Sequence, residues 1–224
     1  MAESAVRIAI VGAESTGKTS LAAALATRLA ADTGLRVTWV PELLREWCDR
    51  AGRTPQVHEQ AAILGAHHHR IEQATVANDL VVCDTTALMT AVYSRLLFGD
   101  RSLEARAAEL HRHMALTLLM ALDLPWVADG HQRDGPHVRE PVDTLLREAL
   151  TAHSLPWAVI AGSGPARLEN ALEAVAPLLR NRARAGGGIF SRLARRNADP
   201  AARHWRCEHC DDPACELQHV QRRL

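Results

Sequence analysis

Short apolar runs alternate with longer amphipathic stretches over the first 180 residues of the chain. The apolar runs predict five strands, at 6–11, 35–40, 79–84, 116–122 and 157–161. Between them, apolar residues recur at helical spacing and predict helices over 20–29, 43–50, 54–78, 86–97, 102–113, 141–152 and 165–180. Strands that alternate with helices indicate a parallel sheet. We therefore predict an α/β fold, a three-layer sandwich around a five-stranded parallel sheet.

The first strand leads into Gly12–Thr19, which reads G-A-E-S-T-G-K-T and fits the P-loop pattern G-x-x-x-x-G-K-[ST]. Lys18 is the only lysine among 26 Lys and Arg residues. A P-loop needs a compact ammonium group near the phosphates, and a planar guanidinium is a poor substitute. The pattern indicates a P-loop NTPase fold that binds ATP through Gly12, Ala13, Glu14, Ser15, Thr16, Gly17, Lys18, Thr19 and Ser20.

Carboxylates follow the second and third predicted strands. Since parallel strands end at one edge of a sheet, Glu42 and Asp84 should face the P-loop. Thr19 and Asp84 are then expected to hold Mg²⁺, although Asp84 would also suit the cap of the next helix. Glu42 would orient or deprotonate an acceptor hydroxyl, or simply favour the dipole of the following helix.

The polar segment 129–139 follows the fourth strand and carries Gly130, Gly135 and Pro136. It predicts a mobile loop in which Arg133 and Arg139 act as a lid over the transferring phosphoryl group. The alternative is a solvated charged loop without a catalytic part.

Several P-loop classes do not fit this chain. A GTPase motif N/T-K-x-D would need a second lysine, and Asp84-Thr85 lacks the glutamate that motor ATPases carry beside this aspartate. There is no L-S-G-G-Q transporter signature. A compact kinase for a small hydroxyl-bearing acceptor fits best, with Lys18, Glu42, Asp84 and Arg133 as catalytic residues. The alternative is a regulatory switch that hydrolyses ATP and signals through a Cys-rich tail.

Four motifs together resemble the ribosylnicotinamide kinase domain of NadR-type proteins. They are the P-loop with Glu-Ser inside it, V-P-E-L-L-R-E at 40–46, C-D-T at 83–85 and P-W-V-A-D-G at 125–130. The resemblance covers about residues 5–178 and implies phosphorylation of nicotinamide riboside by ATP, with Glu42, Arg45, Asp84 and Asp129 on the riboside side. The family often has a second acid where this chain has Thr86. Because the chain starts at the kinase strand, we expect no adenylyltransferase activity.

The end of the chain differs in charge and composition. Residues 1–180 carry a net charge of −4 and residues 181–224 one of +4. We predict a kinase domain over 1–180, a basic Gly/Arg-rich linker over 181–203 and a tail over 204–224. In the tail, Cys207, Cys210, Cys215 and His219 would bind one Zn²⁺, with His204 or His209 as alternative fourth ligands. The alternative is a reduced, metal-free tail.

Overall composition limits the partners. The formal net charge is zero, no apolar run reaches membrane-spanning length, and the acidic N-terminus does not resemble a signal peptide. We expect a cytoplasmic protein without a membrane or nucleic-acid partner, and with a protein partner for the tail as one option. The histidines at 67–69, 111 and 113 are interpreted as solvated surface residues.

Overall fold

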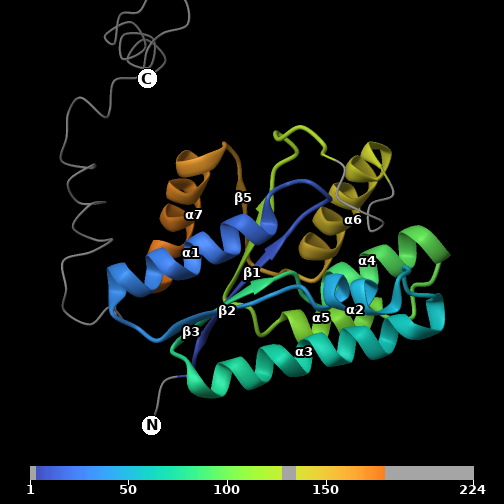
Figure 1. Cartoon of the computed structure of the whole chain (residues 1–224), viewed down its shortest axis with the longest axis horizontal. Coiled ribbons are helices and arrows are strands. Elements are labelled where there is room, and N and C mark those ends of the chain that lie inside the picture. Colours follow the sequence, from blue (N-terminus) through green and yellow to red (C-terminus); the bar gives the residue numbers. More distant parts are fainter. Residues whose placement is uncertain (1–3, 128–134, 180–224) are drawn as a thin grey trace, which may run out of the picture. The chain divides into compact units, whose positions relative to one another are not determined.

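Strands and helices alternate through residues 4–127 and 135–179, which are the residues that this computed structural model describes (Figure 1). The strands are β1 (Val6–Val11), β2 (Val37–Val40), β3 (Leu80–Asp84), β4 (Leu116–Met120) and β5 (Trp157–Ile160). The α-helices are α1 (Lys18–Thr33), α2 (Leu43–Ala51), α3 (Gln60–Ala77), α4 (Ala87–Phe98), α5 (Glu104–His111), α6 (Arg139–Ala152) and α7 (Gly164–Leu179). Two 3-10 turns, η1 (Val57–Glu59) and η3 (Pro136–Val138), precede α3 and α6.

All five strands form one parallel sheet in the order β2-β3-β1-β4-β5. The P-loop strand β1 is central, with Ile8 opposite Val82 of β3 and Leu116 of β4. The α/β class and the five-stranded parallel sheet predicted from the sequence are confirmed.

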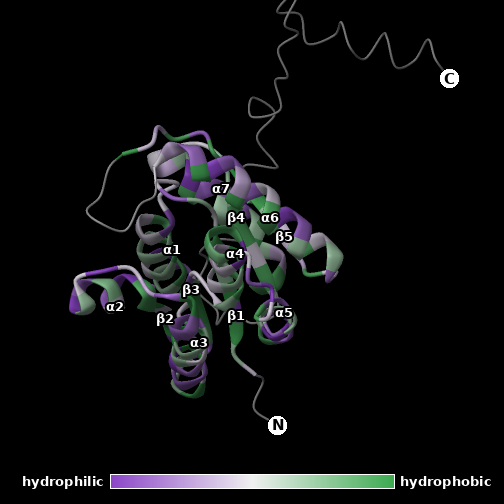
Figure 2. Ribbon diagram, turned by 90° about the vertical axis from the view of Figure 1, so that its right-hand side faces the viewer, coloured by the Kyte–Doolittle hydropathy of each residue, from purple (hydrophilic) through white to green (hydrophobic). Residues whose placement is uncertain are grey.

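Helices cover both faces of the sheet (Figures 1 and 2). Helix α1 packs against α7, and α4 packs against α3, α5 and α6. Side chains of β1 alternate between the layers: Ala9 and Val11 join the core beneath α3, α4 and α6, while Ile8 and Ile10 are buried on the other side. Burial of one such Ile contributes about 1.5–3 kcal/mol.

Helix α3 begins later than predicted. The sequence favours a start at Thr54-Pro55, but the helix begins at Gln60 after the turn η1. The Glu59 carboxylate accepts hydrogen bonds from the Gln56 backbone N–H (2.7 Å) and from both terminal nitrogens of Arg53 (2.8 and 2.7 Å). This capping box closes the turn η1, so α3 begins five residues after Pro55.

The surface interpretation is wrong for His67 and His111, which are 2% and 1% exposed. His67 lies one turn from Ile63 and Ile71, so it falls on the buried face of α3. His111 is hydrogen-bonded between Thr86 (2.9 Å) and Thr117 (2.7 Å). Burial lowers the pKa of each imidazole to about 4.

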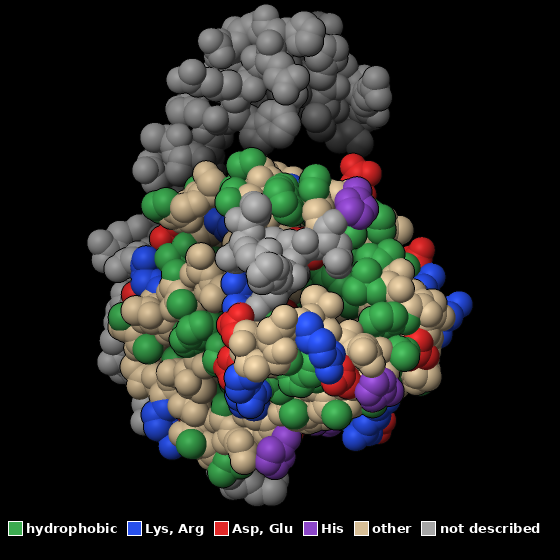
Figure 3. Space-filling model, turned by 45° about the vertical axis from the view of Figure 1, so that its right-hand side comes forward, with side chains coloured by type: hydrophobic (Ala, Val, Ile, Leu, Met, Phe, Trp, Pro, Cys, Tyr) green, Lys and Arg blue, Asp and Glu red, His purple; other side chains and the backbone are tan. Residues whose placement is uncertain are grey.

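On the face that Figure 3 displays, basic and acidic side chains lie side by side. The surface ion pairs of the chain include Arg36–Asp79 (2.8 Å) and Arg106–Glu109 (2.8 Å). Among the described residues, no helix has the length and apolar character needed to cross a bilayer.

Candidate active site

The segment Gly12–Gly17 runs from the carboxyl end of β1 to the start of α1 and folds back on itself. Gly12 has φ +152°, and a Cβ atom there would lie 2.9 Å from the Cβ of Met120 on β4, so a larger residue would clash. Gly17 adopts the left-handed conformation immediately before α1. The Thr16 hydroxyl donates to the Ala13 carbonyl (2.8 Å) and closes the loop. The predicted P-loop therefore has the form of a phosphate cradle at a helix N-terminus.

Ser15 joins the P-loop to the segment after β4. Its hydroxyl donates to the carbonyl of Val127 (2.8 Å) and accepts from the N–H of the same residue (3.2 Å). The first part of the P-W-V-A-D-G motif thus lies against the phosphate loop, as two motifs of one site would.

Lys18 is the first residue of α1, and its Nζ donates to the Ala13 carbonyl (2.9 Å). Burial lowers the pKa of Lys18, and the nearby carboxylates of Glu42, Asp84 and Glu14 oppose that fall. The sole lysine of the chain therefore lies among the three acids that the carboxyl ends of β1, β2 and β3 bring together.

Asp84 ends β3 beside Thr19, whose Oγ1 donates to Asp84 Oδ2 (2.6 Å). The following helix is capped by Thr86, which accepts from the Leu88 N–H, so Asp84 is not the cap residue. Asp84 is 1% exposed, and its Oδ1 has no hydrogen-bond partner within the described part of the chain. Burial raises the pKa of Asp84, and the hydrogen bond from Thr19 and the charges of Lys18 and Arg45 oppose this.

Thr19 and Asp84 fit a Mg²⁺ site. A buried carboxylate oxygen without a donor is stabilised by a cation, and hydroxyl and carboxylate oxygens are ligands that Mg²⁺ prefers.

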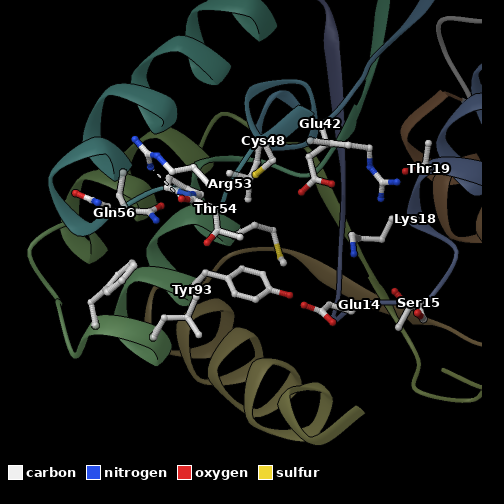
Figure 4. A pocket seen from close by; sticks show the side chains of 18 of the residues that line it. Glu14, Ser15, Lys18, Thr19, Glu42, Cys48, Arg53, Thr54, Gln56 and Tyr93 are labelled. Carbon is white, nitrogen blue, oxygen red and sulfur yellow. Dashed lines mark hydrogen bonds between the residues drawn. The ribbon is translucent and has the colours of Figure 1, made fainter. Parts of the chain in front are cut away.

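Glu42 precedes α2 at the carboxyl end of β2. Its side chain makes no capping hydrogen bond to that helix. Burial raises the pKa of Glu42, while the positive charge of Lys18 acts in the opposite direction. Figure 4 shows Glu42, Lys18 and Glu14 around one space, into which the hydroxyl of Tyr93 also points. Glu42 therefore faces the phosphate site, and its position before α2 also favours the dipole of that helix, so the two roles considered for it are compatible.

A cavity of about 1020 Å³ extends from the P-loop to the ends of η1 and α4. Its inner end is polar and includes Glu14, Lys18, Glu42 and Arg45. The rest is lined by Leu44, Cys48, Arg53, Thr54, Pro55, Gln56, Val57, His58, Gln60, Met89, Tyr93, Leu97 and Phe98. The volume is at the upper end of the range for small-molecule sites and leaves room beyond the phosphates.

A family model described as AAA domain (AAA_28) matches residues 7–167. The chain belongs to this AAA-domain family. No curated protein matches it.

Three solved structures share the fold of this AAA domain. A NadR protein in complex with NAD and AMP-PNP has a TM-score of 0.61 and 19% identity, and a NadR protein in complex with NR has a TM-score of 0.62 and 20% identity. Both matches cover 77% of this chain but only 49% and 50% of the NadR chains. Deoxyadenosine kinase from M. mycoides, with dCMP and dCDP bound, has a TM-score of 0.54 and 13% identity over 77% of this chain and 100% of its own.

The NadR matches confirm the resemblance expected from the four motifs, at the level of fold. The match spans about half of each NadR protein.

The structure of the AAA domain brings together most of the predicted site residues. Arg45 lines the inner cavity, and its charge acts on Lys18, Glu42 and Asp84. Asp129 and Arg133 lie outside the described residues. The same holds for the predicted linker and for the tail with Cys207, Cys210, Cys215 and His219. Arg139, the other predicted lid residue, opens α6 and donates to the Leu124 carbonyl (2.8 Å).

Sequence reasoning missed the residues that line the outer cavity of this AAA domain, among them Gln60 and Tyr93. Gln60 is 3% exposed and opens α3. Tyr93 is the only tyrosine of the chain and lies on α4. A buried Gln at a helix start and a lone Tyr in a strongly apolar helix are weak signals, because neither residue belongs to a recurring motif.

Proposed function

We propose that this chain is an ATP-dependent kinase that phosphorylates a hydroxyl group of a nucleoside-like acceptor, with nicotinamide riboside as the first acceptor to test. The observation that carries the proposal is the continuity of the cavity, which passes from the P-loop over Lys18 and Glu42 to a region lined by Gln60, Tyr93 and Phe98. A site that only hydrolysed ATP would need room for a water molecule beside the γ-phosphate, not for an acceptor molecule large enough to fill the outer cavity. The solved structures with NR and with dCMP add support at the level of fold.

In this proposal, the P-loop N–H groups and Lys18 bind the β- and γ-phosphates of ATP. Thr19 and Asp84 would hold Mg²⁺, which neutralises charge on the phosphate oxygens when it is bound. Arg45 lies at the same end of the cavity and adds positive charge beside the transferred group. Arg133 and Asp129 are proposed to complete the site from the segment after β4.

Glu42 is proposed as the general base. It accepts the proton of the acceptor hydroxyl while that oxygen forms a bond to the γ-phosphorus, and the bond between the γ-phosphorus and the bridging oxygen of ADP breaks. Burial moves the pKa of Glu42 upward, toward the working pH, and so makes it a stronger base than an ordinary glutamate.

The outer cavity supports an acceptor with a flat, partly apolar group. Tyr93, Met89 and Phe98 offer apolar and aromatic surface, and Gln60 offers an amide. The Arg53 guanidinium, also at this end, is paired with Glu59 and lies 5.1 Å from the Trp47 ring centre, so its charge is balanced. A nucleoside or a nicotinamide riboside matches this mixture of ribose hydroxyls and a planar ring.

The test is an acceptor screen with the full chain, ATP and Mg²⁺. Nicotinamide riboside and the common nucleosides are incubated in parallel, and phosphorylated product is measured by mass spectrometry alongside ADP. We expect ADP to form only with an accepted riboside and in equal amount to its monophosphate, and Lys18→Ala to abolish both. ATP hydrolysis at one rate with every acceptor and without any would contradict the kinase and favour the switch.

Two further assignments stay proposals. The tail is proposed to hold Zn²⁺ through Cys207, Cys210, Cys215 and His219, which metal analysis of the purified chain tests directly. A cytoplasmic location is proposed from the cysteine usage.

A further inference from the structure

Arg167 is a buried arginine of α7 that the mechanism above does not use. It is 4% exposed. Its Nε donates to the Gly162 carbonyl (2.6 Å), its Nη1 to the Thr16 carbonyl and its Nη2 to the Asp123 carboxylate. One guanidinium therefore joins three loops at the carboxyl ends of strands: the P-loop after β1, the segment after β4 and the loop after β5.

Asp123 closes this cluster. Its Oδ1 accepts from Arg167, and its Oδ2 accepts from the Gly162 N–H (2.6 Å). A planar guanidinium with donors in fixed directions can hold three acceptors at once, which a flexible ammonium cannot. The Arg167 guanidinium and the Asp123 carboxylate thus hold the three loops in one arrangement.

The contact with Thr16 has a consequence for the neighbouring peptide. The Thr16 carbonyl and the Gly17 N–H belong to the same planar trans peptide group, in which C=O and N–H point in opposite directions. When the carbonyl is held toward Arg167, the N–H is aimed away from α7. Gly17 is also the position where this orientation needs fixing, because a left-handed glycine (φ +79°) allows many backbone conformations.

We propose that Arg167 is a positioning residue that locks the Thr16–Gly17 peptide so that the Gly17 N–H donates to the β-phosphate of the bound nucleotide. The inference deepens the proposed function and rests on its P-loop nucleotide site, but not on the identity of the acceptor. The Asp123 carboxylate keeps Arg167 in place by pairing with it.

The test compares Arg167→Gln with Arg28→Gln in ADP binding by calorimetry. The glutamine amide ends at the same distance along the side chain as Nε of arginine, so Arg167→Gln can keep the bond to Gly162 but not those to Thr16 and Asp123. Arg28 is the matched control, since it is also partly buried and joins α1 to Glu169 of α7 but contacts no P-loop backbone. Loss of one hydrogen bond to a charged phosphate predicts that the Kd for ADP rises about 10-fold in Arg167→Gln and stays near wild type in Arg28→Gln.

AMP, which lacks the β-phosphate, serves as the second ligand, and its Kd should change much less than that of ADP. Equal ADP affinity of the two variants overturns the inference, and so does an equal loss of affinity for ADP and AMP.

A second measurement does not depend on a variant that folds. In the ¹⁵N-labelled wild-type chain, the Gly17 amide signal should move downfield when ADP binds, and a Gly17 signal that does not move also overturns the inference. If wild type and variants behave as expected but no acceptor is phosphorylated, the proposed function fails while the role of Arg167 stands.

Discussion

The Thr19 hydroxyl donates to Asp84 across 65 residues of sequence, with 2.6 Å between Oγ1 and Oδ2. This hydrogen bond joins the first turn of α1 to the end of β3 and leaves Asp84 Oδ1 buried without a donor in the described part of the chain. The relationship places both expected magnesium ligands side by side and gives the buried Asp84 at the end of an apolar strand one hydrogen-bond donor.

Asp84→Asn should remove most of the phosphoryl transfer, because a neutral amide replaces the carboxylate that faces the cation. We expect kcat to fall on the order of 100-fold, and the Mg²⁺ concentration for half-maximal activity to rise. A Mg²⁺ titration of the acceptor-dependent reaction measures both. Asp79→Asn is the control, because Asp79 precedes the same strand but pairs with Arg36 at its opposite end. Equal Mg²⁺ dependence in both variants would show that Asp84 is not a ligand.

Glu42→Gln should lower kcat and leave the KM for ATP nearly unchanged, because the amide keeps the shape of the side chain but cannot accept the proton. Loss of a general base costs about 100- to 10,000-fold. In wild type, kcat should rise with pH through the pKa of Glu42, which burial places above its usual value of 4.5, and this limb should vanish in the variant. A variant that keeps wild-type kcat and its pH profile would contradict the assignment.

Glu42 and Glu46 lie one turn apart and should affect stability in opposite directions. Burial raises the pKa of Glu42, whereas the hydrogen bond from Arg70 lowers that of Glu46. The stability that protonated Glu42 contributes is therefore present below its unfolded pKa and is lost as pH rises through the folded one. The stability from Glu46 is present above its unfolded pKa and is lost as pH falls.

Urea unfolding of Glu42→Gln and Glu46→Gln at pH 4 and pH 7 measures this difference. Relative to wild type, Glu42→Gln should gain stability between pH 4 and pH 7, and Glu46→Gln should lose it. The same sign of change in both variants would contradict the pKa directions.

The sequence alone predicts the parallel sheet and the residues at the inner end of the cavity. Local patterns determine both: apolar runs give the strands, and residues at strand ends, such as Glu42 and Asp84, must meet at one edge of a parallel sheet. Local patterns do not predict which residues line the outer cavity. Gln60 and Tyr93 face it only because α3 and α4 pack at particular rotations, which no local pattern specifies.

Two other features depend on long-range packing. The contact of Arg167 with Thr16 spans 151 residues, and no sequence pattern near either residue predicts it. The prediction that His67 and His111 are exposed is wrong, because each continues the buried spacing of its helix. For these two histidines, the helical spacing of buried positions predicts burial better than the residue type does.

Gln60→Leu should weaken acceptor binding without changing ATP binding. The buried amide lines the cavity beyond the P-loop, and leucine has nearly the same size but no donor or acceptor. We expect the KM for the acceptor to rise about 10-fold and the KM for ATP to stay constant, because one hydrogen bond of this kind contributes about 1 kcal/mol or more. Gln73→Leu, at an exposed position of the same helix, is the control. If both variants raise the acceptor KM equally, or neither does, Gln60 does not contact the acceptor.

His111 should make the fold sensitive to mild acid. Burial lowers its pKa to about 4, below the unfolded value of 6.5, and the ring is hydrogen-bonded between Thr86 and Thr117. As pH falls below 6.5, the unfolded chain takes up a proton that the folded chain does not, so stability is lost until about pH 4. A difference of this size corresponds to about 3 kcal/mol for one histidine.

His111→Gln should therefore lose less stability than wild type between pH 7 and pH 4, although it will be less stable at pH 7. The exposed His113, changed to Gln, should follow wild type at both pH values, and identical pH dependence of His111→Gln and wild type would show that His111 is not held neutral.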